Sequence, residues 1–194
     1  MKTYKALIEP SKDRRDGREK RFDTRRLTLL SLLTAVALVL SLVESMLPPL
    51  LPVAPGAKLG LSNIAPLIAL ILLGVSDAFA VMLAKSLLGA AITGGLSGLM
   101  YSVPSGIASL AVETLLFVTA LGALSLPMIS LIGAVVFNAV QLAVACAVTG
   151  ANLMPLLPLL MAAGIVAGAF TGLATYYLIK RLSYSVYGVR RRKN

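Results

Sequence analysis

Residues 48–63 read PPLLPVAPGAKLGLSN, and this stretch decides how the rest of the chain is arranged. It holds four of the chain's ten prolines, at positions 48, 49, 52 and 55, and it separates two apolar segments. Proline removes a backbone donor and disfavours helix in the residue before it, so the stretch predicts an extended or turned connector. Non-helical backbone near membrane depth is tolerated where protein buries it or where it lines a polar cavity. We therefore expect this connector to close over a ligand site.

The composition is that of a membrane protein. Hydrophobic residues make up 58% of the 194-residue chain, its mean hydropathy is +0.89, and it contains no Trp and no His. One soluble core of this size cannot bury so much apolar surface. The apolar segments have the length of helices, so we predict an all-α membrane protein.

Charge is concentrated at the two ends of the chain. Residues 1–26 carry ten Lys or Arg and five Asp or Glu, and residues 180–194 carry six Lys or Arg and no acid. Cationic segments beside membrane spans stay on the cytoplasmic side, so we expect a multi-pass plasma-membrane protein with both termini in the cytoplasm and an even number of spans. The tails lack the aromatic interleaving that stacks bases, so we expect them to contact the lipid bilayer and no nucleic acid.

Six apolar segments predict a six-transmembrane-helix bundle over residues 27–180, between basic tails at 1–26 and 181–194. The helices are expected at about 27–47, 62–74, 78–93, 99–122, 127–148 and 156–180. The second segment is too short to span unaided, because about thirteen residues of helix reach only about 20 Å. Either the preceding loop dips into the outer leaflet or neighbouring helices shield the gap, and Ser62 or Asn63 can cap its first turn.

Few ionisable residues lie inside the apolar region, and each should face the bundle interior or a partner, since a charge at a helix centre costs ~2.5 to 3.5 kcal/mol on the insertion scale. Lys85 and Glu113 are expected at similar depths on consecutive segments. Two readings stay open: they neutralise each other as a buried ion pair, or Lys85 contacts a ligand. Asp77 follows a turn and is expected to cap the next helix.

Seven residues are candidates for binding a substrate in one outer cavity. They are Glu44, Gly56, Lys58 and Asn63 in and beside the connector, and Lys85, Asn138 and Gln141 beneath it. A few directed polar groups in an apolar wall are the usual form of a small-molecule site, and two lysines suit a ligand with anionic character. The alternatives are that Lys58 extends into water and that Asn138 and Gln141 only hold helices together.

Three parts of the sequence carry a family resemblance. They are Val43-Glu44-Ser45, the run from Pro55 to Ile64, and Gly133-Ala134-Val135 with Asn138 and Gln141. They resemble the Gx transporter family, which is also catalogued as heptaprenyl diphosphate synthase component I. That family is similar to the substrate-binding S components of energy-coupling factor (ECF) transporters. The resemblance covers about residues 27–180.

The resemblance implies a subunit that captures a small vitamin-like or isoprenoid or quinone-precursor molecule from outside, with no cofactor or metal. A separate transmembrane coupling subunit and cytoplasmic ATPases would supply the energy for transport. The contact strip for that partner would fall on Ser31, Ala35, Ala37 and Ser41 of the first helix. Two positions depart from the expected pattern: Lys85 stands where we expect an arginine, which removes the bidentate fork, and Phe137 stands where we expect a histidine.

Two other functions remain alternatives. The catalogued name suggests a membrane component associated with heptaprenyl diphosphate synthesis, and a scaffold without transport is the third reading. Prenyl transfer onto a diphosphate ordinarily needs clustered carboxylates that hold magnesium. Glu44, Asp77 and Glu113 stand singly on different segments, so we expect no enzymatic activity in this chain.

Overall fold

The computed structural model describes residues 24–46, 58, 60–93, 95–120 and 123–191, with the side chains of residues 25, 96, 97 and 182–191 excepted. Helices form nearly all of this part of the chain, and it contains no strand. The elements are α2 (Thr24–Met46), η1 (Leu61–Asn63), α3 (Ile64–Leu72), α4 (Val75–Thr93), α5 (Leu96–Thr119), α6 (Leu126–Thr149), η2 (Met154–Leu156) and α7 (Leu157–Arg191). The all-α prediction is confirmed.

In the described ranges, five helices are long and apolar enough to cross a membrane. These candidate spans are Arg26–Met46, Val75–Thr93, Gly98–Thr119, Leu126–Thr149 and Met154–Arg181. The second of the six expected segments is a shorter apolar helix, Leu61–Leu72, made of η1 and α3. The structure therefore gives a helical bundle of membrane type with five segments of spanning length and one short segment.

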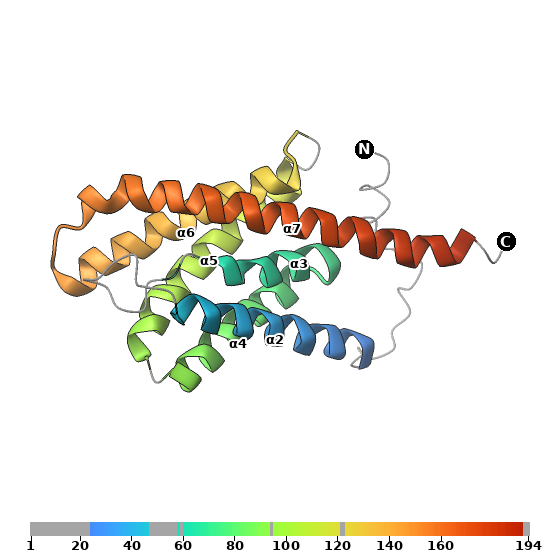
Figure 1. Ribbon diagram of the computed structural model, residues 1–194, viewed down its shortest axis with the longest axis horizontal. Coiled ribbons are helices and arrows are strands. Elements are labelled where there is room, and N and C mark those ends of the chain that lie inside the picture. Colours follow the sequence, from blue (N-terminus) through green and yellow to red (C-terminus); the bar gives the residue numbers. More distant parts are fainter. Residues whose placement is uncertain (1–23, 47–57, 59, 94, 121–122, 192–194) are drawn as a thin grey trace.

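The short helix α3 lies inside the bundle. Six consecutive residues, Ala65 to Leu70, are buried, and they form one core with residues of α2, α4 and α5 such as Leu33, Val81 and Leu110. Figure 1 shows α3 between α7 and α2. A helix that is apolar on all sides is stable only when its neighbours cover it, and here they do.

The helices α6 and α7 pack closely along a row of glycines. A Cβ atom added at Gly172 would lie 2.6 Å from the Pro127 Cα, and one at Gly168 would lie 2.7 Å from the Leu131 Cα. Only glycine fits at such distances from another backbone. Gly164, Gly168 and Gly172, spaced four residues apart on α7, therefore form the surface on which α6 packs.

Two element boundaries differ from the expectation. Helix α7 continues to Arg191, whereas the sixth segment was expected to end at Lys180. Residues 181–187 contain no proline or glycine that would end a helix, so the loss of hydropathy does not end it. Helix α5 starts at Leu96, three residues before the expected start at residue 99.

Asp77 does not act as a simple helix cap, so that prediction is wrong. Its carboxylate accepts two hydrogen bonds from the Arg26 guanidinium, from Nε at 2.7 Å and from Nη2 at 2.5 Å. The fork of a guanidinium matches the two carboxylate oxygens, and this geometry outcompetes a single backbone N–H. The pair joins the start of α2 to the first turn of α4.

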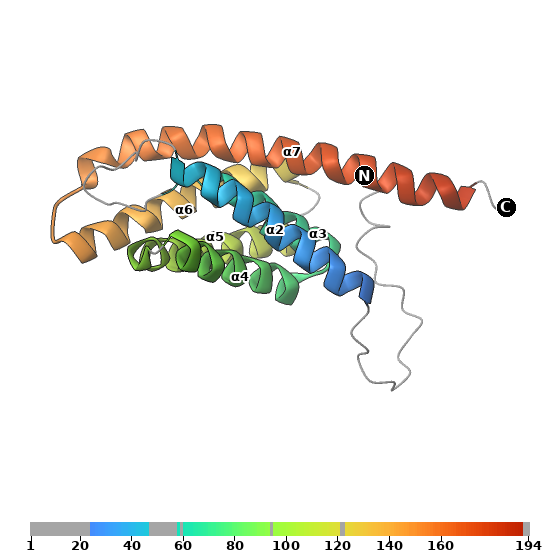
Figure 2. The ribbon, with the colours of Figure 1, turned by 60° about the horizontal axis from the view of Figure 1, so that its bottom comes forward.

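The described ends of the bundle lie toward one end of the molecule. Figures 1 and 2 both show the start of α2 and the end of α7 at one end, and the connection between α6 and α7 at the other. The last turns of α2 and α4 and the first turn of α5 therefore point away from the chain termini (Figure 2).

Candidate functional site

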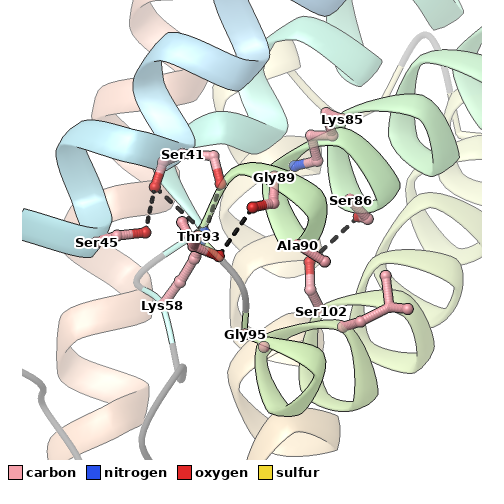
Figure 3. Close-up of a pocket in the computed structure, with 12 residues that line it drawn as sticks. Ser41, Ser45, Lys58, Lys85, Ser86, Gly89, Ala90, Thr93, Gly95 and Ser102 are labelled. Carbon is pink, nitrogen blue, oxygen red and sulfur yellow. Dashed lines mark hydrogen bonds between the residues drawn. The ribbon is translucent and has the colours of Figure 1, made fainter.

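A cavity of about 200 Å³ lies between the second halves of α2 and α4, the start of α5 and Lys58 (Figure 3). We call it the two-lysine cavity. Its wall consists of Ser41, Ser45, Lys58, Lys85, Ser86, Gly89, Ala90, Thr93, Gly95, Gly98, Leu99 and Ser102. Two amines and five hydroxyls thus face one hollow whose described wall contains no carboxylate. Convergent polar groups in a small concave space are typical of a ligand site.

Lys58 is held at both its side chain and its backbone. Its Nζ donates to Ser41 Oγ at 2.6 Å and to the Ser41 carbonyl at 3.2 Å. The Gln141 amide, in the orientation that satisfies both groups, donates to the Lys58 carbonyl and accepts from the Lys58 N–H, each at 3.0 Å. Burial lowers the pKa of the Lys58 amine, and the nearby Glu44 carboxylate offsets part of this shift. Lys58 is thus half-buried, and its amine is bonded to α2.

Glu44 fixes the segment that follows Lys58. Its Oε1 accepts the Leu61 N–H at 2.6 Å, and its Oε2 lies 3.4 Å from the Ser62 nitrogen, which donates to it. These N–H groups begin η1 and have no partner within the helix, so a carboxylate is well placed there. Glu44 is buried but does not line the cavity. Glu44 therefore holds η1 in place without contacting the space inside the cavity.

Lys85 is buried in the middle of α4 and is bonded to the short helical segment. Its Nζ donates to Asn63 Oδ1 at 2.6 Å and to Ser62 Oγ at 3.0 Å. Asn63 is the N-cap residue of α3, as expected, but its side chain accepts from Lys85 and makes no capping hydrogen bond to the helix. Lys85 forms no ion pair with Glu113 in the part of the chain described, so the ion-pair reading is corrected: burial of Lys85 is compensated by hydrogen bonds.

Four hydroxyl residues of the wall escaped the sequence analysis: Ser45, Ser86, Thr93 and Ser102. Ser and Thr are frequent in membrane helices, where they often bond the carbonyl one turn earlier, and the sequence does not separate those from ligand contacts. One signal was present. Ser86 and Thr93 are seven residues apart, which is about two helical turns, so they lie on one face of the helix that carries Lys85.

A family model for heptaprenyl diphosphate synthase component I matches residues 33–178. The chain belongs to the heptaprenyl diphosphate synthase component I family. The matched region contains every residue of the two-lysine cavity and leaves out both basic tails. A comparison with curated proteins gives no match.

Phe137 stands where the resemblance of this chain to its family leads us to expect a histidine. It is buried on α6, and its ring carbon Cδ1 lies 3.2 Å from the position that a Cβ on Gly60 would take. Gly60 has a φ of 89°, so it is suited to glycine for its backbone conformation as well. Phe137 therefore packs under the turn that follows Lys58 and adds no polar group there.

Asn138, a predicted site residue, and Glu113, the expected ion-pair partner of Lys85, both lie away from the cavity in this family member. Asn138 donates from Nδ2 to the Leu160 carbonyl at 3.1 Å, so it joins α6 to α7, as its alternative reading proposed. Glu113 is buried against Gly133 of α6, whose missing side chain gives the carboxylate its space. Neither residue lines the two-lysine cavity, and Gln141 contributes through the Lys58 backbone.

The strip expected to contact a partner divides into two pairs. Ala37 and Ser41 are buried within the chain, Ala37 in the core and Ser41 beside Lys58, so they offer no free surface. Ser31 and Ala35 are exposed on α2 and line a shallow, mostly apolar hollow of about 420 Å³ between α2 and α4. Gly56 and the rest of the connector over 47–57 lie outside the described residues.

No cluster of three or more His, Cys, Asp or Glu side chains that could hold a metal ion occurs among the described residues. The three acids Glu44, Asp77 and Glu113 are tied to η1, Arg26 and the α5–α6 contact, respectively. The chemistry that this site offers is therefore recognition by amines and hydroxyls.

Proposed function

We propose that this chain is the substrate-binding subunit of an ECF-type uptake transporter, similar to an S component, and that it takes up a small vitamin-like or quinone-precursor molecule. The observation that supports this most is the two-lysine cavity, where the half-buried amine of Lys58 and the buried amine of Lys85 face one space. Amines held inside a membrane bundle are expensive and mark a binding site or a transport path by default.

The proposed topology has six membrane segments in the plasma membrane, with α3 as a short segment shielded by its neighbours. Both basic tails then lie in the cytoplasm, where cationic flanks are retained. The two-lysine cavity lies toward the end of the bundle opposite to the chain termini (Figures 1 and 2). In this topology the cavity is reached from outside the cell, as a capture subunit requires.

The proposed partners are a transmembrane coupling subunit and a pair of cytoplasmic ATPases. The exposed positions Ser31 and Ala35, beside Ala80 and Ala84 in the hollow between α2 and α4, offer a surface where another helix can approach closely. The work for transport would come from these partners, because the sequence contains no nucleotide-binding motif.

The second candidate function is a membrane component associated with heptaprenyl diphosphate synthesis. The name of the matched family favours it. One observation argues against a catalytic role in this chain. The three described acids of the bundle each contact a different structural partner, so they do not form a common binding site for magnesium and a diphosphate. This candidate therefore places the chain beside a synthase and assigns it no reaction.

Purification of the full chain from its native membrane, under mild extraction, separates the two candidates. Co-purification with a membrane coupling subunit and ATPases, together with ATP-dependent uptake into vesicles, is the expected result. Recovery with a prenyl synthase and without any ATPase would replace the transport proposal by the second candidate. Native mass spectrometry of the same sample reports the small molecule that the protein retains.

A further inference from the structure

We infer that the two-lysine cavity binds a small carboxylic acid that also carries hydroxyl or amino hydrogens. The inference rests on the proposed function, since it names the class of molecule that the subunit captures. It follows from asking which donors and acceptors of the wall remain available after the wall has made its own hydrogen bonds.

Three hydrogen-bond donors of the cavity wall remain available to a ligand. A lysine ammonium has three N–H groups. Lys58 uses two of them on Ser41, and Lys85 uses two on Asn63 and Ser62, so each lysine has one N–H that bonds to none of the described residues and that a ligand can take. Ser41 Oγ accepts from Lys58, and its own hydrogen is used by no described group. Two charged donors and one neutral donor suit the two oxygens of a carboxylate, which together offer about four lone-pair sites.

The other hydroxyls of the wall can only accept. Ser45, Ser86 and Thr93 each donate to a carbonyl one turn earlier, those of Ser41, Met82 and Gly89 respectively. A hydroxyl has one hydrogen, so these three oxygens have only lone pairs left for a ligand. Ser102 lies 3.3 Å from Ser86, whose hydrogen is already used, so Ser102 is the donor in that pair and is likewise left as an acceptor.

The wall therefore offers both cationic donors and neutral acceptors. Figure 3 shows Ser45 and Thr93 near Ser41 and Lys58, and the Ser86–Ser102 pair apart from them. A ligand that uses both sets of groups needs an anionic acceptor group and also hydroxyl or amino hydrogens. A buried hydroxyl oxygen without a donor costs free energy, so a purely hydrophobic acid leaves the acceptor oxygens without a partner from the ligand.

The charge of the site fits one negative charge on the ligand. Lys58 and Lys85 bring two positive charges, and Glu44 behind them brings one negative charge. Glu113 lies against Gly133 and does not face the cavity. A monoanion neutralises what remains, whereas the dianion of a phosphate ester would leave an excess negative charge in a membrane bundle, where unpaired charge is costly.

The size of the cavity favours a compact molecule. A volume of about 200 Å³ corresponds to roughly seven water molecules at about 30 Å³ each. A carboxylic acid with one ring or a short chain fits such a space. A full heptaprenyl chain is several times larger and does not.

The test uses the full chain, purified in detergent and freed of retained ligand, with four matched probes. They are para-hydroxybenzoate, benzoate without the hydroxyl donor, methyl para-hydroxybenzoate without the charge, and phenyl phosphate as the alternative oxyanion. Thermal stabilisation and calorimetry rank their affinities. We expect para-hydroxybenzoate or its para-amino analogue to bind best, and benzoate to bind about fivefold more weakly for each hydrogen bond lost.

Variants separate a contact from a folding effect. Lys58→Met should remove at least about nine-tenths of the affinity for the acids and none of that for the ester, while Ser102→Ala should reduce the preference for the hydroxy acid over benzoate. Ser76→Ala is the control, because Ser76 is an exposed hydroxyl of α4 outside the cavity wall. Each variant is compared by its unfolding midpoint without ligand, so that a misfolded sample is recognised.

Binding of phenyl phosphate or of the methyl ester at least as tight as that of the hydroxy acid would overturn the inference, as would absence of any stabilisation by the acids at about 10 mM. A retained native ligand without a carboxyl group would also overturn it. The proposed function is judged separately by the ATPase partners. A phosphate ligand with ATPases present rejects only the inference, and an acid ligand with a prenyl synthase in place of ATPases rejects only the transport role.

Discussion

Gln141 of α6 holds the backbone of Lys58 through two hydrogen bonds of 3.0 Å, one to its carbonyl and one from its N–H. The side-chain amide thus bonds both backbone groups of one residue, as a neighbouring strand does in an antiparallel sheet. These two hydrogen bonds position the Lys58 amine at the edge of the two-lysine cavity. The amide that the sequence placed in contact with a ligand therefore acts through the connector.

We expect Gln141→Met to destabilise the protein by about 2–4 kcal/mol, because two buried backbone groups of Lys58 lose their partners at about 1–3 kcal/mol each, partly relieved by movement of the connector. Binding of an acid should weaken by at least about tenfold, since Lys58 is no longer held in place. Unfolding midpoints and calorimetry measure the two effects. Asn138→Ala is the control on the same helix: it should lower the midpoint and leave the affinity unchanged, because Asn138 bonds Leu160 outside the cavity. An unchanged affinity in Gln141→Met would contradict the positioning role.

Glu44→Gln should change which oxyanion the site prefers. The substitution keeps one acceptor for the Leu61 N–H and removes the negative charge behind the two lysines. At an effective dielectric of about 20, one unit charge nearby changes the energy of another by one to a few kcal/mol. The ratio of phenyl phosphate affinity to para-hydroxybenzoate affinity should therefore rise by roughly tenfold. A constant ratio in a folded variant would show that charge balance does not select the ligand.

The pH dependence should separate binding from stability at Lys58. Burial lowers the pKa of its amine below the ordinary value of 10.5, so the folded, ligand-free protein releases this proton at a lower pH than the unfolded chain. Between the lowered pKa and 10.5 the unfolded state binds more protons, and stability against unfolding rises with pH. Affinity for an acid falls over the same window, because the neutral amine no longer attracts it. Lys58→Met should flatten both curves, and parallel curves for the two proteins would contradict the assignment.

Hydropathy and charge predicted much of the fold, because they report what each segment does in a membrane. The apolar lengths predicted α2 and α6 to within a few residues. The shortness of residues 62–74 left two possibilities, a dipping loop or shielding by neighbours, and the structure shows that neighbours cover α3. The end of α7 was missed because a helix continues in water when nothing breaks it. The pairing of Asp77 with Arg26 was missed because the two residues are 51 positions apart and only the packing of α2 on α4 brings them together.

The site was predicted less completely, for a different physical reason. Lys58 and Lys85 stood out because an amine in an apolar segment needs an explanation. The direction in which an amide points is set by its partner, so the sequence did not distinguish the role of Gln141 from that of Asn138. The hydroxyls are uncharged and bond within their own helix, as Ser86 does, so they leave little trace in a hydropathy pattern.

The packing of α6 on α7 leads to the last prediction, which concerns stability alone. Gly172→Ala places a Cβ 2.6 Å from the Pro127 Cα, and because that atom is backbone, the two helices must separate. We expect a loss of about 1–3 kcal/mol, as for other overpacked contacts. Gly164→Ala should cost less, since its nearest atom is Nδ2 of the Asn138 side chain, which can move. Ala162→Leu on the exposed face of α7 should be nearly neutral. Unfolding midpoints in detergent rank the three variants, and a larger loss for Gly164→Ala than for Gly172→Ala would contradict this account of the interface.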